Sequence, residues 1–301
     1  MSSLLGLVFA SLTALFKSSS SIISKELLDT DLNPYVSSWA LRIFALPALL
    51  PALYLAGGIP PLESNFFPLL LLNTVIGVLG TVFYMKALNV GDISLVDPIS
   101  ALSPLLLLIT TPLIVNEFPS PLGLVGVMII VCGVYLLKLQ KVTGSDTFSK
   151  ETVFSPFYGL AKEPATKYIF LMIVVYSISA PIDKVIVEAS GPIMYTTSLH
   201  ICQSIILTGV AIYTTDSWRS DMFSRDTIKL SSIGLLSGLA SMFQMIALTY
   251  TLVVYVISIK RLGILIGTLW GIFVRKESGG IPRLIGSGLI IVGTILISLA
   301  L

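Results

Sequence analysis

The sequence predicts an all-α membrane protein with ten transmembrane helices, arranged as two inverted five-helix repeats. The first observation is composition: 55% of the 301 residues are hydrophobic and only 11% are charged, and the mean hydropathy is +0.96. In an average soluble domain about a quarter of the residues are charged. The surface of this protein must therefore face lipid over most of its area. The other two observations are the length of the apolar runs and an internal repeat.

The apolar runs have the length of membrane spans. A helix needs about 20 predominantly apolar residues to cross ~30 Å of hydrocarbon. Ten runs meet this requirement: Leu4–Ser24, Val36–Ala56, Phe67–Leu88, Ser94–Val115, Pro121–Leu139, Tyr168–Val187, Ile193–Tyr213, Ile228–Tyr250, Thr251–Val274 and Ile281–Leu299. None alternates as a barrel strand would, and backbone amides must be paired inside lipid, so the runs are predicted to be helices.

An internal repeat divides the chain into two parts. At an offset of 160 residues, Glu117, Gly126 and Gly133 recur as Glu277, Gly286 and Gly293. We therefore expect a first five-helix repeat at residues 1–140, a connecting segment at 141–167 and a second five-helix repeat at 168–301. Because each repeat has an odd number of helices, the second enters the membrane from the opposite side. The amphipathic stretch Val153–Tyr158 within the connecting segment is expected to lie on the bilayer surface.

The repeated residues have predicted structural uses. Gly126 and Gly133 are seven residues apart, so they share one helix face and allow close helix packing in lipid. The alternative is that these glycines form a homodimer face. Glu117 and its equivalent Glu277 precede a helix in each repeat, where a carboxylate favours a helix N-terminus. We predict that both act as caps and not as transport residues.

The pattern of repeated residues resembles the drug/metabolite transporter superfamily, in particular its ten-helix EamA-like members. It is carried in the first half by Lys25, Pro34, Arg42, Tyr84-x-x-Ala87-Leu88, Pro104, Glu117, Gly126 and Gly133, and in the second half by Lys184, Pro192, Ala247-Leu248, Glu277, Gly286 and Gly293. The resemblance covers nearly the whole chain. It implies a transporter in the cytoplasmic (plasma) membrane of a prokaryote, and it does not specify the substrate.

The second half departs from the first at three places. His200 stands at the position equivalent to Arg42, and Gln244 at the position equivalent to Tyr84. Lys260-Arg261 replaces the small pair Ser100-Ala101. The last difference means that the substrates of better-known relatives do not carry over to this chain.

Charged residues inside the spans are the main functional signal. An ionisable residue deep in a span costs about 3 kcal/mol or more and usually faces the bundle interior or a watery cavity. Lys17, Lys260 and Arg261 are predicted to lie deep, and Asp183-Lys184 follows a helix break expected at Pro181. A set of shallower charges is expected to serve as interfacial anchors or in local ion pairs: Lys25, Arg42, Lys86 and Asp97.

Polar and aromatic residues could complete a pocket around these charges. His200 and Gln203 are three residues apart and share a helix face. For the aromatic residues, helix packing or contact with the lipid interface is an equally good interpretation. His200 is the single histidine, so the sequence predicts no metal site, and packing or proton coupling are its alternatives. The full set of predicted substrate-binding residues is Lys17, Trp39, Tyr84, Asp183, Lys184, His200, Gln203, Gln244, Lys260 and Arg261.

The sequence predicts a carrier and not an enzyme. It has none of the common catalytic motifs, no nucleotide-binding loop and no cofactor motif, so a solute or ion gradient would have to supply the energy. The predicted partners are the lipid bilayer and a small substrate, and no nucleic acid. Because deep cations outnumber the one deep acid, we expect a substrate with a carboxylate or phosphate. The alternatives are a multidrug-type cation exporter and a non-transporting receptor or scaffold.

The distribution of Lys and Arg predicts the orientation. The connections after the fifth, seventh and ninth helices, with the helix ends beside them, contain eleven basic residues, and those after the second, fourth, sixth and eighth contain none. Basic loops face the cytoplasm, which places both termini outside. Ten-helix relatives are generally described with both termini inside.

Overall fold

The computed structural model describes residues 2–28, 34–90, 100–143, 164–214, 227–273 and 281–301. Every regular element in these ranges is an α-helix, so the predicted all-α class is confirmed for the described part of the chain. The chain forms two compact units. The first unit comprises Met1–Val78 and Ile182–Tyr250, and the second comprises Leu79–Pro181 and Thr251–Leu301.

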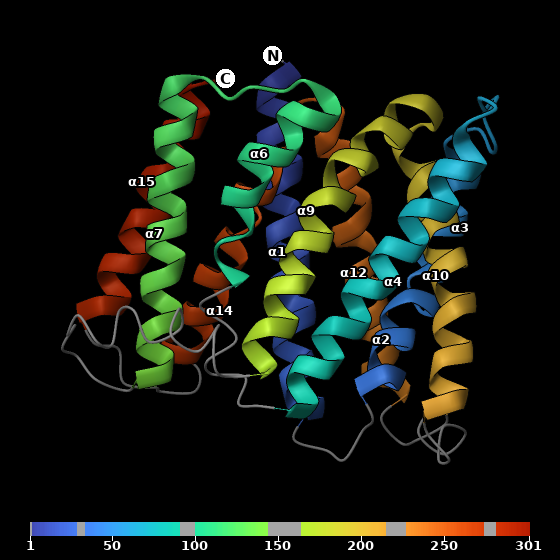
Figure 1. The fold of residues 1–301 in the computed structure, drawn as a ribbon, viewed down its shortest axis with the longest axis horizontal. Helices are drawn as coiled ribbons and strands as arrows, with labels where there is room; N and C mark the ends of the chain where they lie inside the picture. Colours follow the sequence, from blue (N-terminus) through green and yellow to red (C-terminus); the bar gives the residue numbers. More distant parts are fainter. Residues whose placement is uncertain (1, 29–33, 91–99, 144–163, 215–226, 274–280) are drawn as a thin grey trace. The chain divides into compact units, whose positions relative to one another are not determined.

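The first unit is built from parts of seven helices (Figure 1). These are α1 (Ser2–Leu28), α2 (Pro34–Ile43), α3 (Leu46–Leu55), the beginning of α4 (Phe66–Val90), the end of α9 (Pro164–Ser190), α10 (Pro192–Thr214) and α12 (Thr227–Leu248). Both α2 and α10 start with proline, which has no amide proton to leave unpaired and whose backbone angle already suits the first helical position. Gly191 joins α9 to α10 with a φ of 80°, a conformation that suits glycine.

The second unit contains the remainder of α4 and α9 and five further helices. The five are α6 (Ser103–Val115), α7 (Pro121–Thr143), α13 (Val253–Ile259), α14 (Leu262–Phe273) and α15 (Ile281–Leu299). Two long helices therefore pass from one unit into the other: α4 after Val78 and α9 after Pro181. Each unit takes helices from both halves of the sequence.

Seven helical segments are long and apolar enough to cross a membrane. Three shorter apolar helices accompany them: Ser103–Val115, Pro121–Leu137 and Ile285–Leu299. Two of the seven spans are interrupted, because Tyr35–Leu55 consists of α2 and α3, and Val253–Trp270 consists of α13 and α14. These proportions are those of a multi-pass integral membrane protein.

Helix α1 packs on α12 in the first unit through stacked aromatic rings. The ring of Phe243 lies 5.9 Å from that of Phe9 and 5.4 Å from that of Phe16, measured between centroids. Further along the pair, the Ser20 hydroxyl donates a hydrogen bond of 3.1 Å to the carbonyl of Ile233. Lys17, the charged residue of α1 whose side chain the structure describes, therefore belongs to a helix that is packed firmly on α12.

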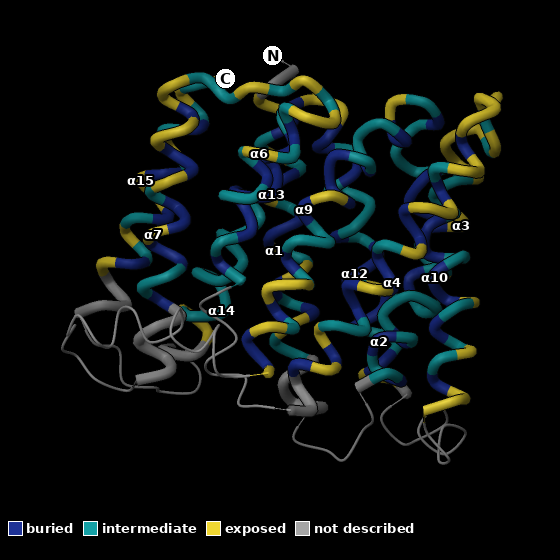
Figure 2. The backbone as a smooth tube through the Cα atoms, in the orientation of Figure 1, coloured by how far each residue is buried: buried dark blue, intermediate teal, exposed yellow. Residues whose placement is uncertain are grey.

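Helices α7 and α15 pack closely in the second unit, and their buried residues face each other (Figure 2). A Cβ atom added to Gly126 would lie 2.8 Å from the carbonyl oxygen of Gly293, and one added to Gly133 would lie 2.7 Å from that of Gly286. The prediction of close packing by these glycines is therefore confirmed. Because their faces are occupied within one chain, they give no support to a homodimer interface.

Glu117 caps a helix, as predicted, and the helix is α13. Its Oε2 atom accepts a hydrogen bond of 2.9 Å from the backbone amide of Val253, the first residue of α13. The sequence associated Glu117 with the helix that follows it, because tertiary contacts between the two halves are not visible in a linear pattern. The predicted cap Glu277 and the predicted interfacial stretch Val153–Tyr158 lie outside the described residues.

Candidate functional site

Lys17 lies on the buried face of α1 and yet is exposed. Ala10 and Thr13, seven and four residues earlier, share its face of the helix, and each is at most 1% exposed. Leu15 lies nearly opposite Lys17 around the helix and is 46% exposed, as expected for a lipid-facing side chain. Lys17 is thus an exposed cation on the same helix face as the buried residues Ala10 and Thr13.

His200 and Gln203 present buried polar atoms with no hydrogen-bond partner in the described part of the chain. His200 is 1% exposed, and its Nδ1–H donates to the carbonyl of Thr196 at 2.9 Å. Its Nε2 atom, on the other side of the ring, and the Oε1 atom of Gln203 are both buried and unpartnered. An unsatisfied buried polar group costs about 1–3 kcal/mol, so two of them, three residues apart on α10, require an explanation.

Arg42 completes the group. Its charge acts on both Lys17 and His200, and the charge of Lys17 also acts on His200. We call Lys17, Arg42, His200 and Gln203 the cationic cluster. The sequence placed Arg42 among the interfacial anchors, although its equivalence to His200 in the repeat was a signal that the two could be neighbours.

Asp183 lies in a buried cluster that the sequence did not predict. The Asn73 side-chain amide donates to Asp183 Oδ1 at 2.7 Å, and the Tyr195 hydroxyl donates to the same oxygen at 2.5 Å. The Asn73 amide also donates to the Tyr195 oxygen at 2.7 Å. Asn73 and Tyr195 are an ordinary amide and an ordinary aromatic in apolar runs, so no pattern marked them as partners of Asp183.

Lys184 and Trp39 have structural contacts of their own. The ammonium of Lys184 lies 4.0 Å from the carboxylate of Glu188, one helical turn along α9. The indole N–H of Trp39 donates to the Thr208 hydroxyl at 2.9 Å. The Trp39 ring packs edge-on against Phe44, with centroids 5.8 Å apart. These contacts favour the packing interpretation for Trp39 and a local ion pair for Lys184.

The remaining predicted residues divide between the units. Gln244 is half-buried on α12 in the first unit, next to the stacked ring of Phe243. Tyr84 is 38% exposed on the part of α4 that belongs to the second unit. Lys260 is half-buried directly after α13, also in the second unit. For these three residues a role in substrate binding stays a prediction.

Arg261 has protein partners. It lies in the break between α13 and α14, and its Nη2 group donates to the carbonyl of Ser100 at 3.2 Å and to the hydroxyl of Ser103. In the sequence repeat, Arg261 is equivalent to Ala101, which lies in the turn before α6. The guanidinium therefore bridges the broken segment of one half to the corresponding segment of the other.

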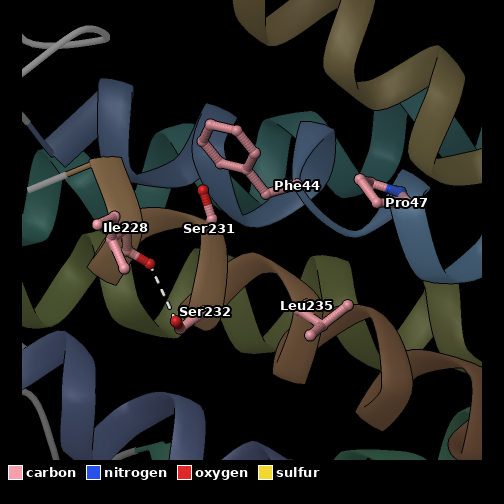
Figure 3. A pocket seen from close by; sticks show the side chains of 6 residues that line it. All are labelled: Phe44, Pro47, Ile228, Ser231, Ser232 and Leu235. Carbon is pink, nitrogen blue, oxygen red and sulfur yellow. Dashed lines mark hydrogen bonds between the residues drawn. The ribbon is translucent and has the colours of Figure 1, made fainter.

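A separate pocket of about 370 Å³ lies beside the break between α2 and α3 (Figure 3). Its lining residues come from that break and from α12: Phe44, Pro47, Ile228, Ser231, Ser232 and Leu235. The Ser232 hydroxyl already donates to the carbonyl of Ile228 at 2.9 Å. None of the lining residues is charged and none was predicted as a site residue, so the cationic cluster is the better candidate.

The helices and the charged interior define the class: a multi-pass membrane protein with a polar site inside its first unit. Residues 4–139 match the EamA-like transporter family. This segment makes up nearly all of the first predicted repeat, and for this part of the chain the match confirms the resemblance drawn from the sequence.

One solved structure, described as a crystal structure of a protein, has the same fold. The TM-score is 0.78, the alignment covers 98% of this chain and 96% of that chain, and 14% of the residues are identical. At this identity the likeness concerns the fold alone. The comparison with curated proteins gave no match.

Proposed function

We propose that the protein is a secondary transporter for a small metabolite that carries a carboxylate or phosphate, and that the cationic cluster binds this anionic group. The observation that carries the proposal is the exposure of Lys17 on the buried face of α1, within electrostatic range of Arg42 and of His200, whose unpartnered Nε2 atom lies on the same face of α10 as the unpartnered Oε1 atom of Gln203. The EamA-like family match supplies the transport function. No residue of the described chain forms a salt bridge with Lys17.

An anion resolves the electrostatic problem of the cluster. Two positive charges that act on each other within a membrane-spanning region repel, and each is costly to hold there. A carboxylate or phosphate at Lys17 offsets this repulsion and accepts a charge-assisted hydrogen bond from the ammonium group. Gln203 can donate to the anion through its amide NH2 group, and His200 can donate through Nε2 only as the imidazolium, because its Nδ1–H already donates to the carbonyl of Thr196. An organic cation would instead add a third positive charge.

Alternating access between two inverted five-helix repeats is the proposed mechanism. The glycine contacts support it: Gly126 packs on Gly293 and Gly133 on Gly286. The 160-residue offset relates Gly126 to Gly286 and Gly133 to Gly293. It therefore converts the Gly126–Gly293 contact into the Gly133–Gly286 contact, as a two-fold axis between the repeats would. Seven spans long and apolar enough to cross a membrane, with three shorter apolar helices beside them in the described part of the chain, are compatible with such an arrangement.

The test is ligand binding followed by exchange. In purified protein, small carboxylates and phosphate esters should raise the melting temperature with concentration, because a ligand that binds the folded state stabilises it by mass action. The best ligand should then support counterflow exchange in proteoliposomes. Stabilisation and exchange by a hydrophobic cation, with no response to any anion, would establish the cation exporter. Binding without exchange of any ligand would establish a receptor.

The orientation is part of the same proposal. The charge count favours both termini on the outside, and family descriptions favour the inside. Alkaline phosphatase fused after Leu301 should be active in cells if the count is right, and green fluorescent protein at the same position should then be dark.

A further inference from the structure

We infer that Asp183, held by Asn73 and Tyr195, is a proton-binding site that couples transport to a proton gradient. The inference rests on the proposed transport function and concerns its energy source. The Asp183 carboxylate takes up one proton from the side with the higher proton concentration and releases it on the other. No bond other than the O–H bond forms or breaks, and the proton is the only co-reactant.

The geometry fits a carboxylate whose protonation changes its partners. Asn73, Asp183 and Tyr195 are 1%, 7% and 0% exposed. Both donors point at one oxygen of Asp183, and the Asn73 amide also donates to the Tyr195 oxygen. All three hydrogen bonds suit the ionised carboxylate, which can only accept. A proton on Oδ1 makes that oxygen a donor and disrupts the bonds to it, and a proton on Oδ2 leaves Oδ1 an uncharged acceptor, so in either case the two hydrogen bonds from Asn73 and Tyr195 lose their charge assistance and weaken.

The position of the cluster gives such a rearrangement a mechanical consequence. Asn73 lies on α4 five residues before that helix leaves the first unit, and Asp183 lies on α9 one residue after that helix enters it. The cluster thus joins, within the first unit, the two helices that continue into the second. Pro181 immediately precedes the crossing, and a proline inside a helix removes one backbone hydrogen bond and loosens the chain there. Weakening the cluster would free α4 and α9 from each other at this point.

The neighbouring titratable groups leave Asp183 as the group that can carry the proton. From α10 the titratable side chain that faces Asp183 is Tyr195, a phenol that is neutral at physiological pH. The stretch of α4 from Phe66 to Val78 contributes the neutral amide of Asn73 and has no titratable residue. On α9, Lys184 and Glu188 are paired with each other one turn away.

The central experiment separates coupling from transport. Asp183→Asn keeps the size and the acceptor oxygen of the side chain and removes the titration. In proteoliposomes loaded with the anion identified above, the ratio of proton-gradient-driven accumulation to counterflow exchange should fall by about ten-fold or more in the variant. Undiminished accumulation in the variant would overturn the inference and leave the proposed function intact.

Two further measurements test the inference if the Asp183→Asn variant fails to fold or if the protein shows no transport. Tyr195→Phe removes one donor to the ionised carboxylate and so favours the protonated form. The pH of half-maximal accumulation should then shift upward by about one unit. In purified wild-type protein, infrared spectra recorded against pH should show one buried carboxyl group titrating between about pH 4 and 9, and this signal should be missing in Asp183→Asn. Absence of the signal in wild type would overturn the inference whatever the outcome of the transport assays.

Discussion

The two units hold their membrane-embedded cations in different ways. In the second unit, the Nη2 group of Arg261 donates to the Ser100 carbonyl and the Ser103 hydroxyl beside the break between α13 and α14, although the buried Nε atom of the same guanidinium makes no hydrogen bond within the described residues. In the first unit, Lys17 is exposed on the inward face of α1, close to Arg42 and to buried polar atoms that lack a partner. Depth in a span determines how costly a charge is, and the surrounding partners determine whether it serves structure or ligand binding.

This difference has an energetic basis. A guanidinium that donates to protein oxygens recovers part of its lost hydration within the protein, so it stabilises the empty state. Unpartnered atoms such as His200 Nε2 and Gln203 Oε1 destabilise the empty state by about 1–3 kcal/mol each. In the proposed function, ligand binding recovers part of this cost in the first unit.

The largest expected effect follows from removing the exposed cation. Lys17→Ala should raise the Kd of the anionic ligand by about 30-fold or more, since truncating one partner of a buried charge pair costs about 2–5 kcal/mol. Ligand-induced melting shifts or calorimetry would measure the change. Lys17→Arg, which keeps the charge, should retain most of the affinity. Equal loss in both variants would mean that the shape of the side chain, and not its charge, is required.

Gln203→Met should separate stability from binding. The substitution removes a buried unpartnered oxygen and keeps a similar volume, so the free energy of unfolding without ligand should rise by about 1 kcal/mol. The Kd should rise about ten-fold, because the ligand loses one hydrogen bond. A lower melting temperature without ligand would show that Gln203 has a structural partner after all.

Arg261→Met should have the opposite profile. It removes both hydrogen bonds to the serines and leaves the Ser100 carbonyl without this donor, which should lower the free energy of unfolding by about 1–3 kcal/mol. The Kd should stay within about three-fold of wild type. Ser103→Ala is the matched control and should cost less, since it removes one partner and keeps the cation. If Arg261→Met instead abolishes binding at unchanged stability, Arg261 is a ligand-binding residue, as the sequence predicted.

The smallest effect is expected for Trp39, which lies in the first unit and which we expect to lie outside the ligand site. Trp39→Phe removes the hydrogen bond to Thr208, and inter-helix hydrogen bonds in membrane proteins contribute about 0.6 kcal/mol on average. The melting temperature should fall slightly and the Kd should not change. A double-mutant cycle with Thr208→Val isolates the bond. An affinity loss in Trp39→Phe would return this residue to the binding site.

The sequence determined the fold class and the inventory of charges. Runs of about 20 apolar residues have one stable solution in lipid, so the helices could be predicted from length alone. The spacing of Gly126 and Gly133 indicated a close helix contact, because a face without side chains has few other uses. The cost of burying charge likewise singled out Lys17, Asp183 and Arg261 as residues that need an explanation.

The partners of those charges were decided only by the tertiary structure. Arg261 meets Ser103 across 158 positions, and Asp183 meets Asn73 across 110. A serine or an asparagine in an apolar run is compatible with a helix cap, a packing contact or a hydrogen bond to any neighbour, so periodicity cannot select its partner. Arg42 shows the same limit, because its place near a span end suggested an anchor until the fold brought it close to His200. Local sequence fixes which groups must be satisfied, and the packing of distant helices decides what satisfies them.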